Sequence, residues 1–317
     1  MHVIGINQTV IPEVDIIIVT TTGLLTVFGV VANWLILCVV AKQKHLHKRA
    51  NALLFSLALL DFSTCALSGP YSIITFFKNS PWPSFTVCRG MLIYGVASTL
   101  ASCLFNALIS INCLHGILSQ NGLVHTWNQV LVVAMTVLGW VVFITFVLAP
   151  LYFLHEVTFQ PRLGVCYIND GDTTLPFAIA IFSMTAVSWI ISLICYLKIA
   201  NIVRISSAHL RVAAVTSNEP VPQMNQLNAR NRYLIKLVQT VFITFLFYIV
   251  FFIPLLIVEL LYRSDLNPHY LLHRTACLIL WSSSVLNPYI YIYRLKDIRK
   301  AIVNILPCGY RIDIVAA

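Results

Sequence analysis

The sequence predicts an all-α membrane protein, in which seven transmembrane helices form a bundle and a short amphipathic eighth helix follows. Two observations support this fold class. Of the 317 residues, 59% are hydrophobic and only 10% are charged, whereas a soluble domain carries about a quarter charged residues. The apolar residues also gather into seven segments, each longer than the roughly 20 residues that a membrane-spanning helix needs.

Charged or turn-forming residues separate the seven segments. A helix is expected in each, because lipid offers no partner to unpaired backbone groups and because the strands of membrane barrels are only about ten residues long. The predicted spans are Ile16–Ala41, Ala50–Phe77, Phe85–Leu118, Asn128–Leu154, Thr174–Ile202, Leu234–Leu261 and Leu271–Tyr293.

The distribution of basic residues predicts the orientation in the membrane. Fifteen of the 20 Lys and Arg residues lie in the linker after the first span, in the linker after the fifth, and in the tail. Cytoplasmic segments carry such an excess, so we expect a multi-pass plasma-membrane protein with an extracellular N-terminus and a cytoplasmic C-terminus. The net charge of +9 then reflects topology and attraction to membrane lipid, and it does not indicate a nucleic-acid partner.

The chain divides into four regions under this topology. They are an extracellular N-terminus over residues 1–15, a transmembrane domain over 16–293, an amphipathic helix over 294–306 and a cytoplasmic tail over 307–317. Within the transmembrane domain, residues 207–233 are polar and poor in apolar side chains, and we expect a partly disordered cytoplasmic loop there.

Spacing predicts the amphipathic helix, because its apolar and basic residues fall on opposite sides. The apolar side holds Ile298, Ala301, Ile302 and Ile305, and the basic side holds Lys296, Arg299 and Lys300. Cys308 follows and is a palmitoylation candidate. On the predicted extracellular side, Asn7 begins a glycosylation acceptor triplet, although such triplets are common by chance.

Several residues in the spans form a pattern whose parts are individually weak and collectively specific. In chain order they are Asn33 in the first span, Asp61 in Ser56–Asp61 of the second, Cys88 at the start of the third, Trp140 in the fourth, Tyr196 in the fifth, Pro254 in the sixth, and Asn287-Pro288-Tyr289-Ile290-Tyr291 at the end of the seventh. With these motifs in this order, nearly the whole chain resembles the rhodopsin-like (class A) G-protein-coupled receptors. The shorter run Ser102–Asn112 is similar to the melatonin receptors and their orphan relatives.

The resemblance implies a receptor that passes an extracellular ligand signal to a heterotrimeric G protein or an arrestin. It implies no enzyme, and the sequence shows no metal-ligand cluster, nucleophile motif or phosphate loop. Two alternatives remain open. One is a seven-helix receptor that does not couple and serves as a decoy or dimer partner, and the other is a transporter or channel, which would need more buried ionisable residues than Asp61 alone.

Asp61 is the only acidic residue well inside a predicted span. A carboxylate is costly in hydrocarbon, so this side chain should face the bundle interior and a partner. Ser102, Ser283 and Asn287 offer polar atoms, and a bound sodium ion or a proton would neutralise the charge. No other cofactor is expected. The group is either an ion-linked switch site or a structural hydrogen-bond cluster.

The resemblance also implies a disulfide bond. Cys88 and Cys166 are the two of the nine cysteines that fall on predicted extracellular ends or loops, and the secretory route permits a bond between them. In the family, this bond ties the second extracellular loop to the third helix. Two free thiols are the alternative.

Prolines interrupt four of the apolar runs, at Pro70, Pro150, Pro254 and Pro288. A proline tends to kink a helix, and although most such prolines are architectural, kinks in the sixth and seventh helices accompany activation in the family. The residues that the resemblance assigns to activation and to the G-protein interface are Asn112, Cys113, Leu114, Tyr196, Phe252, Pro254, Pro288 and Tyr291.

The third span departs from the family at its cytoplasmic end. Where the family has Asp, Glu or Asn followed by Arg-Tyr, this chain has Asn112-Cys113-Leu114. A thiol cannot replace the permanently charged guanidinium. Phe252 also stands where a tryptophan usually precedes Pro254 by two residues. The receptor therefore either couples without the arginine, or it is a poorly coupling, constitutively shifted or partner-dependent member of the family.

The ligand class is narrowed by exclusion. Amine receptors place an aspartate about two turns into the third helix, where this chain has Gly95. Opsins carry a retinal-linking lysine in the seventh helix, and none lies between Arg274 and Arg294, so no retinal is expected. We therefore expect a non-amine ligand, and the similarity of Ser102–Asn112 to the melatonin receptors implies a small, neutral or weakly polar one.

Candidate ligand-binding residues lie near the predicted extracellular ends of the spans. Aromatic and polar side chains suit a ligand pocket, but they suit interfacial belts and helix packing equally well. For Glu259, a solvated helix end is the simpler interpretation. The candidates are Tyr94, Gly95, Ser98, Glu259, Tyr262 and Trp281.

Overall fold

The computed structural model describes nine stretches of the chain. They are residues 12–43, 49–77, 84–120, 129–150, 157–160, 165–168, 171–216, 222–262 and 269–305. The helices are α1 (Pro12–Lys42), α2 (Arg49–Phe77), α3 (Phe85–Gln120), α4 (Gln129–Leu148), α6 (Gly171–Thr216), α7 (Pro222–Tyr262), α8 (Tyr270–Arg294) and α9 (Lys296–Ile305). Strands β1 (Val157–Gln160) and β2 (Val165–Ile168) pair antiparallel as a hairpin between α4 and α6.

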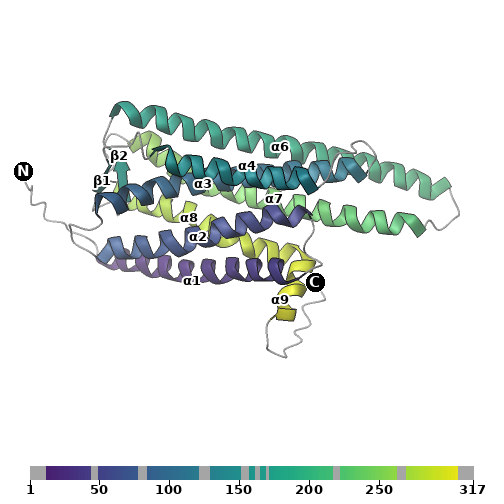
Figure 1. Cartoon of the computed structure of the whole chain (residues 1–317), viewed down its shortest axis with the longest axis horizontal. Coiled ribbons are helices and arrows are strands. Elements are labelled where there is room, and N and C mark those ends of the chain that lie inside the picture. Colours follow the sequence, from purple (N-terminus) through teal and green to yellow (C-terminus); the bar gives the residue numbers. More distant parts are fainter. Residues whose placement is uncertain are drawn as a thin grey trace, which may run out of the picture.

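The predicted fold class is confirmed. Among the described residues, seven helices are long and apolar enough to cross a membrane, and they run side by side along the bundle (Figure 1). The described helix α4 ends at Leu148, and the predicted end of the fourth span at Leu154 lies outside the described residues. A turn at Ala149 follows α4, in keeping with Pro150, since the ring of a proline disfavours helical backbone in the residue before it.

The two ends of the bundle differ in structure. The hairpin of β1 and β2 lies at one end, which we call the hairpin end (Figure 1). Helix α9 lies toward the other end, which we call the α9 end, and there α6 and α7 extend beyond the other helices. A ligand site and an output surface can therefore occupy separate ends of the molecule.

Helix α3 is the centre of the bundle. It contacts α2, α4, α6, α7 and both strands, and its span is the most buried of the seven. By contrast, α4 and α6 are the least buried and carry many exposed apolar side chains. Such a surface is expected where lipid surrounds the helices, because lipid tails are as apolar as the side chains themselves.

Helix α9 confirms the predicted amphipathic helix, with bounds slightly inside the expected 294–306. Its apolar residues Ile298, Ala301 and Ile302 are buried in the main core, while Lys296 and Lys300 are exposed. The buried face packs against α1 and α8. This arrangement leaves Lys296 and Lys300 exposed on the opposite face of the helix, as expected for an amphipathic helix.

The polar stretch 207–233 differs from the disordered loop that we expected. Helix α6 continues to Thr216 and α7 begins at Pro222, so the described part of this stretch is helical. Low hydrophobicity alone was not enough to predict disorder in this stretch. The stretch also contains Ala, Leu, Arg and Gln residues, which favour helix, and it continues two helices that the membrane already stabilises.

A close contact joins α3 to α4 near the middle of the bundle. Phe105 is fully buried and packs edge-on against Trp140, with ring centroids 5.7 Å apart. The indole N–H of Trp140 donates to the Ser56 hydroxyl on α2 at 3.2 Å. A Cβ atom at Gly139 would lie 2.6 Å from the Phe105 ring. Only glycine therefore permits this approach of the two helices.

We predict that Gly139→Ala destabilises the protein by about 1–3 kcal/mol, the usual cost of overpacking a well-packed core. The measurement is the apparent melting temperature in detergent. The matched control is Gly90→Ala on α3, where an added Cβ meets nothing within 4 Å and alanine is the better helix former. Equal melting temperatures for the two variants would show that the contact with Phe105 does not limit the packing.

Candidate functional site

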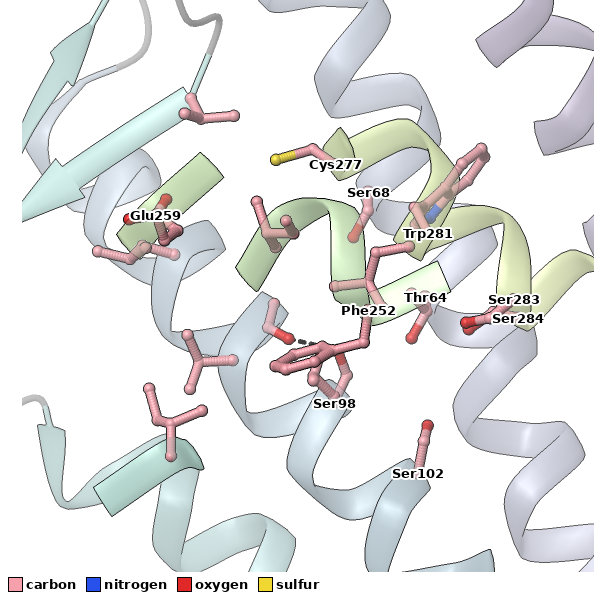
Figure 2. A pocket seen from close by; sticks show the side chains of 18 of the residues that line it. Thr64, Ser68, Ser98, Ser102, Phe252, Glu259, Cys277, Trp281, Ser283 and Ser284 are labelled. Carbon is pink, nitrogen blue, oxygen red and sulfur yellow. Dashed lines mark hydrogen bonds between the residues drawn. The ribbon is translucent and has the colours of Figure 1, made fainter. Parts of the chain in front are cut away.

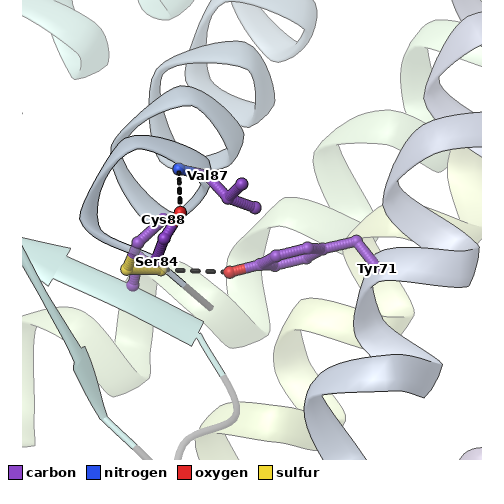
Figure 3. The surroundings of a disulfide bond; sticks show 5 residues. Tyr71, Ser84, Val87 and Cys88 are labelled. Atoms are coloured by element: carbon purple, nitrogen blue, oxygen red, sulfur yellow. Dashed lines mark hydrogen bonds between the residues drawn. A yellow bond between two sulfur atoms is a disulfide. The ribbon is translucent and has the colours of Figure 1, made fainter. Parts of the chain in front are cut away.

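A disulfide bond anchors the hairpin to the start of α3, as predicted. Cys88 lies in the first turn of α3 and Cys166 lies in β2, with their Cα atoms 5.5 Å apart. The Tyr71 hydroxyl of α2 donates to the Cys166 sulfur at 3.0 Å (Figure 3). Since Cys166 also pairs with Phe159 of β1, these contacts hold the whole hairpin over the ends of α2 and α3.

Below the hairpin lies a cavity of about 550 Å³ between α2, α3, α6, α7 and α8. Val165 and Cys166 of β2 contribute to its lining. Most of the lining is apolar, and this volume falls within the range of small-molecule sites. The hairpin and the disulfide therefore shape one boundary of a ligand-sized space.

The polar groups of the cavity are not spread evenly. Its serine and threonine residues come from α2, α3 and α8, whereas α6 contributes the apolar residues Ile181 and Phe182. In Figure 2, Thr64, Ser283 and Ser284 lie together on one side and Glu259 lies on the other. The hydroxyl-bearing group comprises Thr64, Ser68 and Ser72 of α2, Ser98, Thr99 and Ser102 of α3, and Ser283 and Ser284 of α8.

Phe252 of α7 forms part of the cavity wall and is itself buried. Its ring packs edge-on against Trp189 and Phe182 of α6, with centroid distances of 5.5 and 5.8 Å. Pro254 follows two residues later inside α7. An occupant of the cavity that displaced Phe252 would therefore act on α6 and on the proline-containing part of α7 together.

Glu259 and His273 form an ionisable pair in the cavity lining. The His273 Nε2 atom lies 3.1 Å from the Glu259 Oε1 atom, joining α8 to α7. The Cys277 sulfur lies 3.8 Å from the other ring nitrogen. The His273 side chain is 4% exposed and that of Glu259 is 25% exposed, so the carboxylate is the accessible member of the pair.

Asp61 lies fully buried at the centre of a second polar group. The Asn287 side-chain amide donates to its Oδ2 atom at 2.9 Å, and Ser284 lies beside the carboxylate. The Oδ1 atom has no hydrogen-bond partner among the described residues. Asn33 of α1 donates to the Ser284 carbonyl at 3.0 Å, so these bonds tie α1 and α2 to α8.

At the α9 end, the distinctive third-span residues are buried. Asn112 and Cys113 are both 0% exposed. Tyr196 of α6 stacks on Phe242 of α7 with ring centroids 3.7 Å apart. Tyr291 is buried in the same core cluster as Cys113. In this conformation, then, Cys113 belongs to the core and is not presented at the surface.

A family model described as "7 transmembrane receptor (rhodopsin family)" matches residues 32–291, most of the chain. The chain belongs to this family. It is therefore a class A G-protein-coupled receptor and a multi-pass membrane protein. Receptors of this family bind extracellular ligands and intracellular G proteins or arrestins, and they are generally not enzymes.

The crystal structure of squid rhodopsin is similar to this receptor, with a TM-score of 0.81. The alignment covers 95% of this chain and 87% of the squid chain at 20% sequence identity. At that identity the similarity shows the fold alone. No curated protein matches the sequence.

Several of the predicted site residues of this receptor line the cavity, and others lie elsewhere. Gly95, Ser98, Ser102, Phe252, Glu259, Trp281 and Ser283 line the cavity. Tyr94 does not. Its hydroxyl lies 2.8 Å from that of Ser63 on α2, and its ring packs edge-on against Phe143 of α4. Tyr94 thus connects α3 to α2 and α4. The side chain of Tyr262, another predicted ligand-binding residue, lies outside the described part of the structure.

The sequence analysis did not predict that His273, Cys277 and Ser284 line the cavity of this receptor. Helical spacing could have found them, because steps of three or four residues connect all three with the candidate Trp281 on one face of α8. The same spacing connects Thr64 and Ser68 with Asp61 on α2. Ser284, and not its predicted neighbour Ser283, is the serine that lies beside Asp61.

Proposed function

We propose that this receptor binds a small, largely apolar, non-amine ligand in the cavity at the hairpin end. The proposal places the hairpin end and the N-terminus outside the plasma membrane and the α9 end in the cytoplasm. The basic residues of α9 and the linkers support this orientation. Ligand binding would be passed through the helix bundle to a G protein or an arrestin.

The cavity is the observation that carries the proposal. It is mostly apolar and ligand-sized, and a disulfide-anchored hairpin bounds it. Burial of apolar surface would supply most of the affinity, and a few polar groups would orient the ligand.

The buried aromatic residues supply a route from the cavity to the cytoplasmic end. A ligand that contacts Phe252 presses on α6 and α7, the two helices that extend farthest at the α9 end. Farther along, the stack of Tyr196 on Phe242 joins the same two helices. Tightly packed groups of this kind shift between discrete arrangements and do not deform continuously.

The buried Cys113 favours the second candidate function, a receptor that does not couple and serves as a decoy or dimer partner. Cys113 stands in place of the family's arginine and is fully buried. A G protein would meet no guanidinium there. Our first proposal therefore requires that the partner recognise other surfaces at this end, such as the extended α6 and α7.

We predict that membranes containing the wild-type receptor accelerate nucleotide exchange on an added heterotrimeric G protein. The comparison is with the same membranes lacking the receptor and with the double variant Cys113→Arg, Leu114→Tyr. Exchange above background in the wild type supports coupling without the arginine.

The double variant also separates the two candidate functions. Its folding is checked first by its melting temperature, because an arginine replaces a buried thiol. If exchange appears only in the folded double variant, the receptor is non-coupling in its natural form and the first proposal fails.

We also propose that Asp61 forms an ion-linked switch site. Its Oδ1 atom is buried and lacks a hydrogen-bond partner among the described residues, and hydroxyl groups of Ser102, Ser283 and Ser284 line the adjoining cavity. Carboxylate and hydroxyl oxygens suit a hard cation such as sodium. A bound sodium ion would neutralise the carboxylate, and these residues would hold it.

Sodium chloride is therefore predicted to raise the melting temperature of the wild type relative to choline chloride at equal ionic strength. The stabilisation should reach about 1.4 kcal/mol when sodium is at ten times its Kd. Asp61→Asn should abolish the difference between the two salts. Equal sodium responses in the two proteins would leave only the structural hydrogen-bond cluster.

The two predicted modifications, glycosylation of Asn7 and palmitoylation of Cys308, fall outside the described residues. Both agree with the proposed orientation, since Asn7 would be extracellular and Cys308 would follow α9 at the cytoplasmic surface.

A further inference from the structure

The described lining of the cavity contains one free thiol, that of Cys277 on α8. The other cysteine of the lining, Cys166, is held in the disulfide bond. Of the six free cysteines among the described residues, four are buried, and only Cys277 and Cys38 are partly exposed. Cys38 lies on α1 and is not part of the lining. Cys277 is therefore the thiol that a molecule in the cavity meets.

The Cys277 side chain has a definite place in the cavity. Figure 2 shows its sulfur projecting from α8 on the side where Glu259 lies, while Ser283 and Ser284 lie on the other side. Leu280 and Trp281 follow Cys277 by three and four residues and also line the cavity, so they lie on the same face of the helix. An apolar ligand that rests against these two side chains brings its other end near the sulfur.

The His273 imidazole lies one helical turn before Cys277. The Cys277 sulfur is 3.8 Å from the His273 Nδ1 atom and 3.9 Å from the Nε2 atom. A thiol reacts as a nucleophile through its thiolate, and an adjacent base is one way in which proteins activate such a group. Contacts of this kind are often long without a ligand and shorten when one binds. The imidazole is thus placed to take the thiol proton.

Glu259 of α7 completes the group. Its Oε1 atom lies 3.1 Å from the His273 Nε2 atom, and a carboxylate at this position orients the ring and stabilises the imidazolium that forms when the proton leaves the sulfur. Cys277, His273 and Glu259 therefore stand in the order of a nucleophile, a base and a group that orients the base.

We propose that Cys277 is a covalent attachment site for small electrophilic ligands of the α,β-unsaturated carbonyl class. These electrophiles are neutral and largely apolar, which suits the cavity, and sulfur is a soft, polarizable atom that matches their β-carbon. The inference rests on the proposed function, in which this cavity holds the ligand of the receptor. It adds the residue that fixes a ligand in place and the chemical group that the ligand must carry.

The step is an addition that needs no oxidant, reductant or further reactant. The Cys277 sulfur forms a bond to the β-carbon while the π bond between the α- and β-carbons breaks, and its electron pair passes toward the carbonyl oxygen to give an enolate. The proton that left the sulfur is held by His273 and then passes to the α-carbon. The product is a saturated ketone joined to Cys277 through a thioether.

Two probes with the same aromatic body test the proposal. Benzylideneacetone is an α,β-unsaturated ketone, and benzylacetone is its saturated analogue, which cannot add a thiol. The purified full chain in lipid nanodiscs is incubated with benzylideneacetone, and the adducts are located by peptide mass spectrometry. We expect labelling of Cys277 to saturate with probe concentration, to be slowed by benzylacetone, and to be about tenfold faster than labelling of Cys38, because binding holds the probe beside the sulfur.

Cysteine variants identify the residue that reacts. Cys277→Ser should abolish the saturable adduct. Cys38→Ser, which removes the other partly exposed free thiol of the described residues, is the matched control and should leave the adduct unchanged. The melting temperature shows that each variant is folded. A saturable adduct that persists in folded Cys277→Ser overturns the proposal.

His273 has its own test. His273→Leu should lower the maximal rate of labelling about tenfold or more, as expected for loss of a base, while the probe concentration at half the maximal rate stays close to the wild-type value. A merely structural role for His273 would instead weaken the binding of both probes. Equal maximal rates in the two proteins would overturn the role of the imidazole.

The outcomes distinguish this inference from the proposed function. If benzylacetone stabilises the receptor while Cys277 is labelled no faster than Cys38, the inference is overturned and the cavity remains a ligand site. If labelling of Cys277 rises linearly with probe concentration and benzylacetone does not slow it, the thiol is accessible but no probe binds beside it. That result contradicts both the inference and the ligand-binding cavity.

Discussion

The structure depends on one constraint, which is that lipid forms no hydrogen bonds with the chain. Each span must satisfy its backbone as a helix, and each polar side chain within a span gains by facing the bundle interior. The constraint explains why Asp61, Asn287 and the cavity serines lie inside while the exposed faces of α4 and α6 are apolar. A polar interior and an apolar exterior thus follow from the same cause.

Helix α3 connects the hairpin end of the bundle to the α9 end. Its first turn carries the disulfide to the hairpin, its middle lines the cavity, and its last turns lie in the core at the α9 end. The close packing of Phe105 against Gly139 and Trp140 holds α3 in register with α4. The residues that could receive a signal and the residues that could deliver one therefore belong to a single, tightly packed element.

Much of the fold was predictable because the length of each apolar segment and the distribution of Lys and Arg between the linkers can be read directly from the sequence. The seven spans, α9 and the disulfide were all expected, and the structure confirms them. The candidate site was only partly predictable, since its composition depends on helix rotation. Tyr94 and Gly95 are neighbours in sequence, yet one faces α2 and α4 while the other lines the cavity. The pairing of Glu259 with His273 joins two helices and leaves no signal in either segment alone.

The most direct test of the account is whether the cavity is where ligands act. A compound collection is screened for thermal stabilisation of the wild type, and each active compound is measured again on Gly95→Trp and Gly90→Trp. Both glycines of α3 have open space around an added Cβ, but only Gly95 lines the cavity. The account predicts that Gly95→Trp abolishes stabilisation and Gly90→Trp preserves it. Stabilisation that persists in a folded Gly95→Trp variant would contradict it.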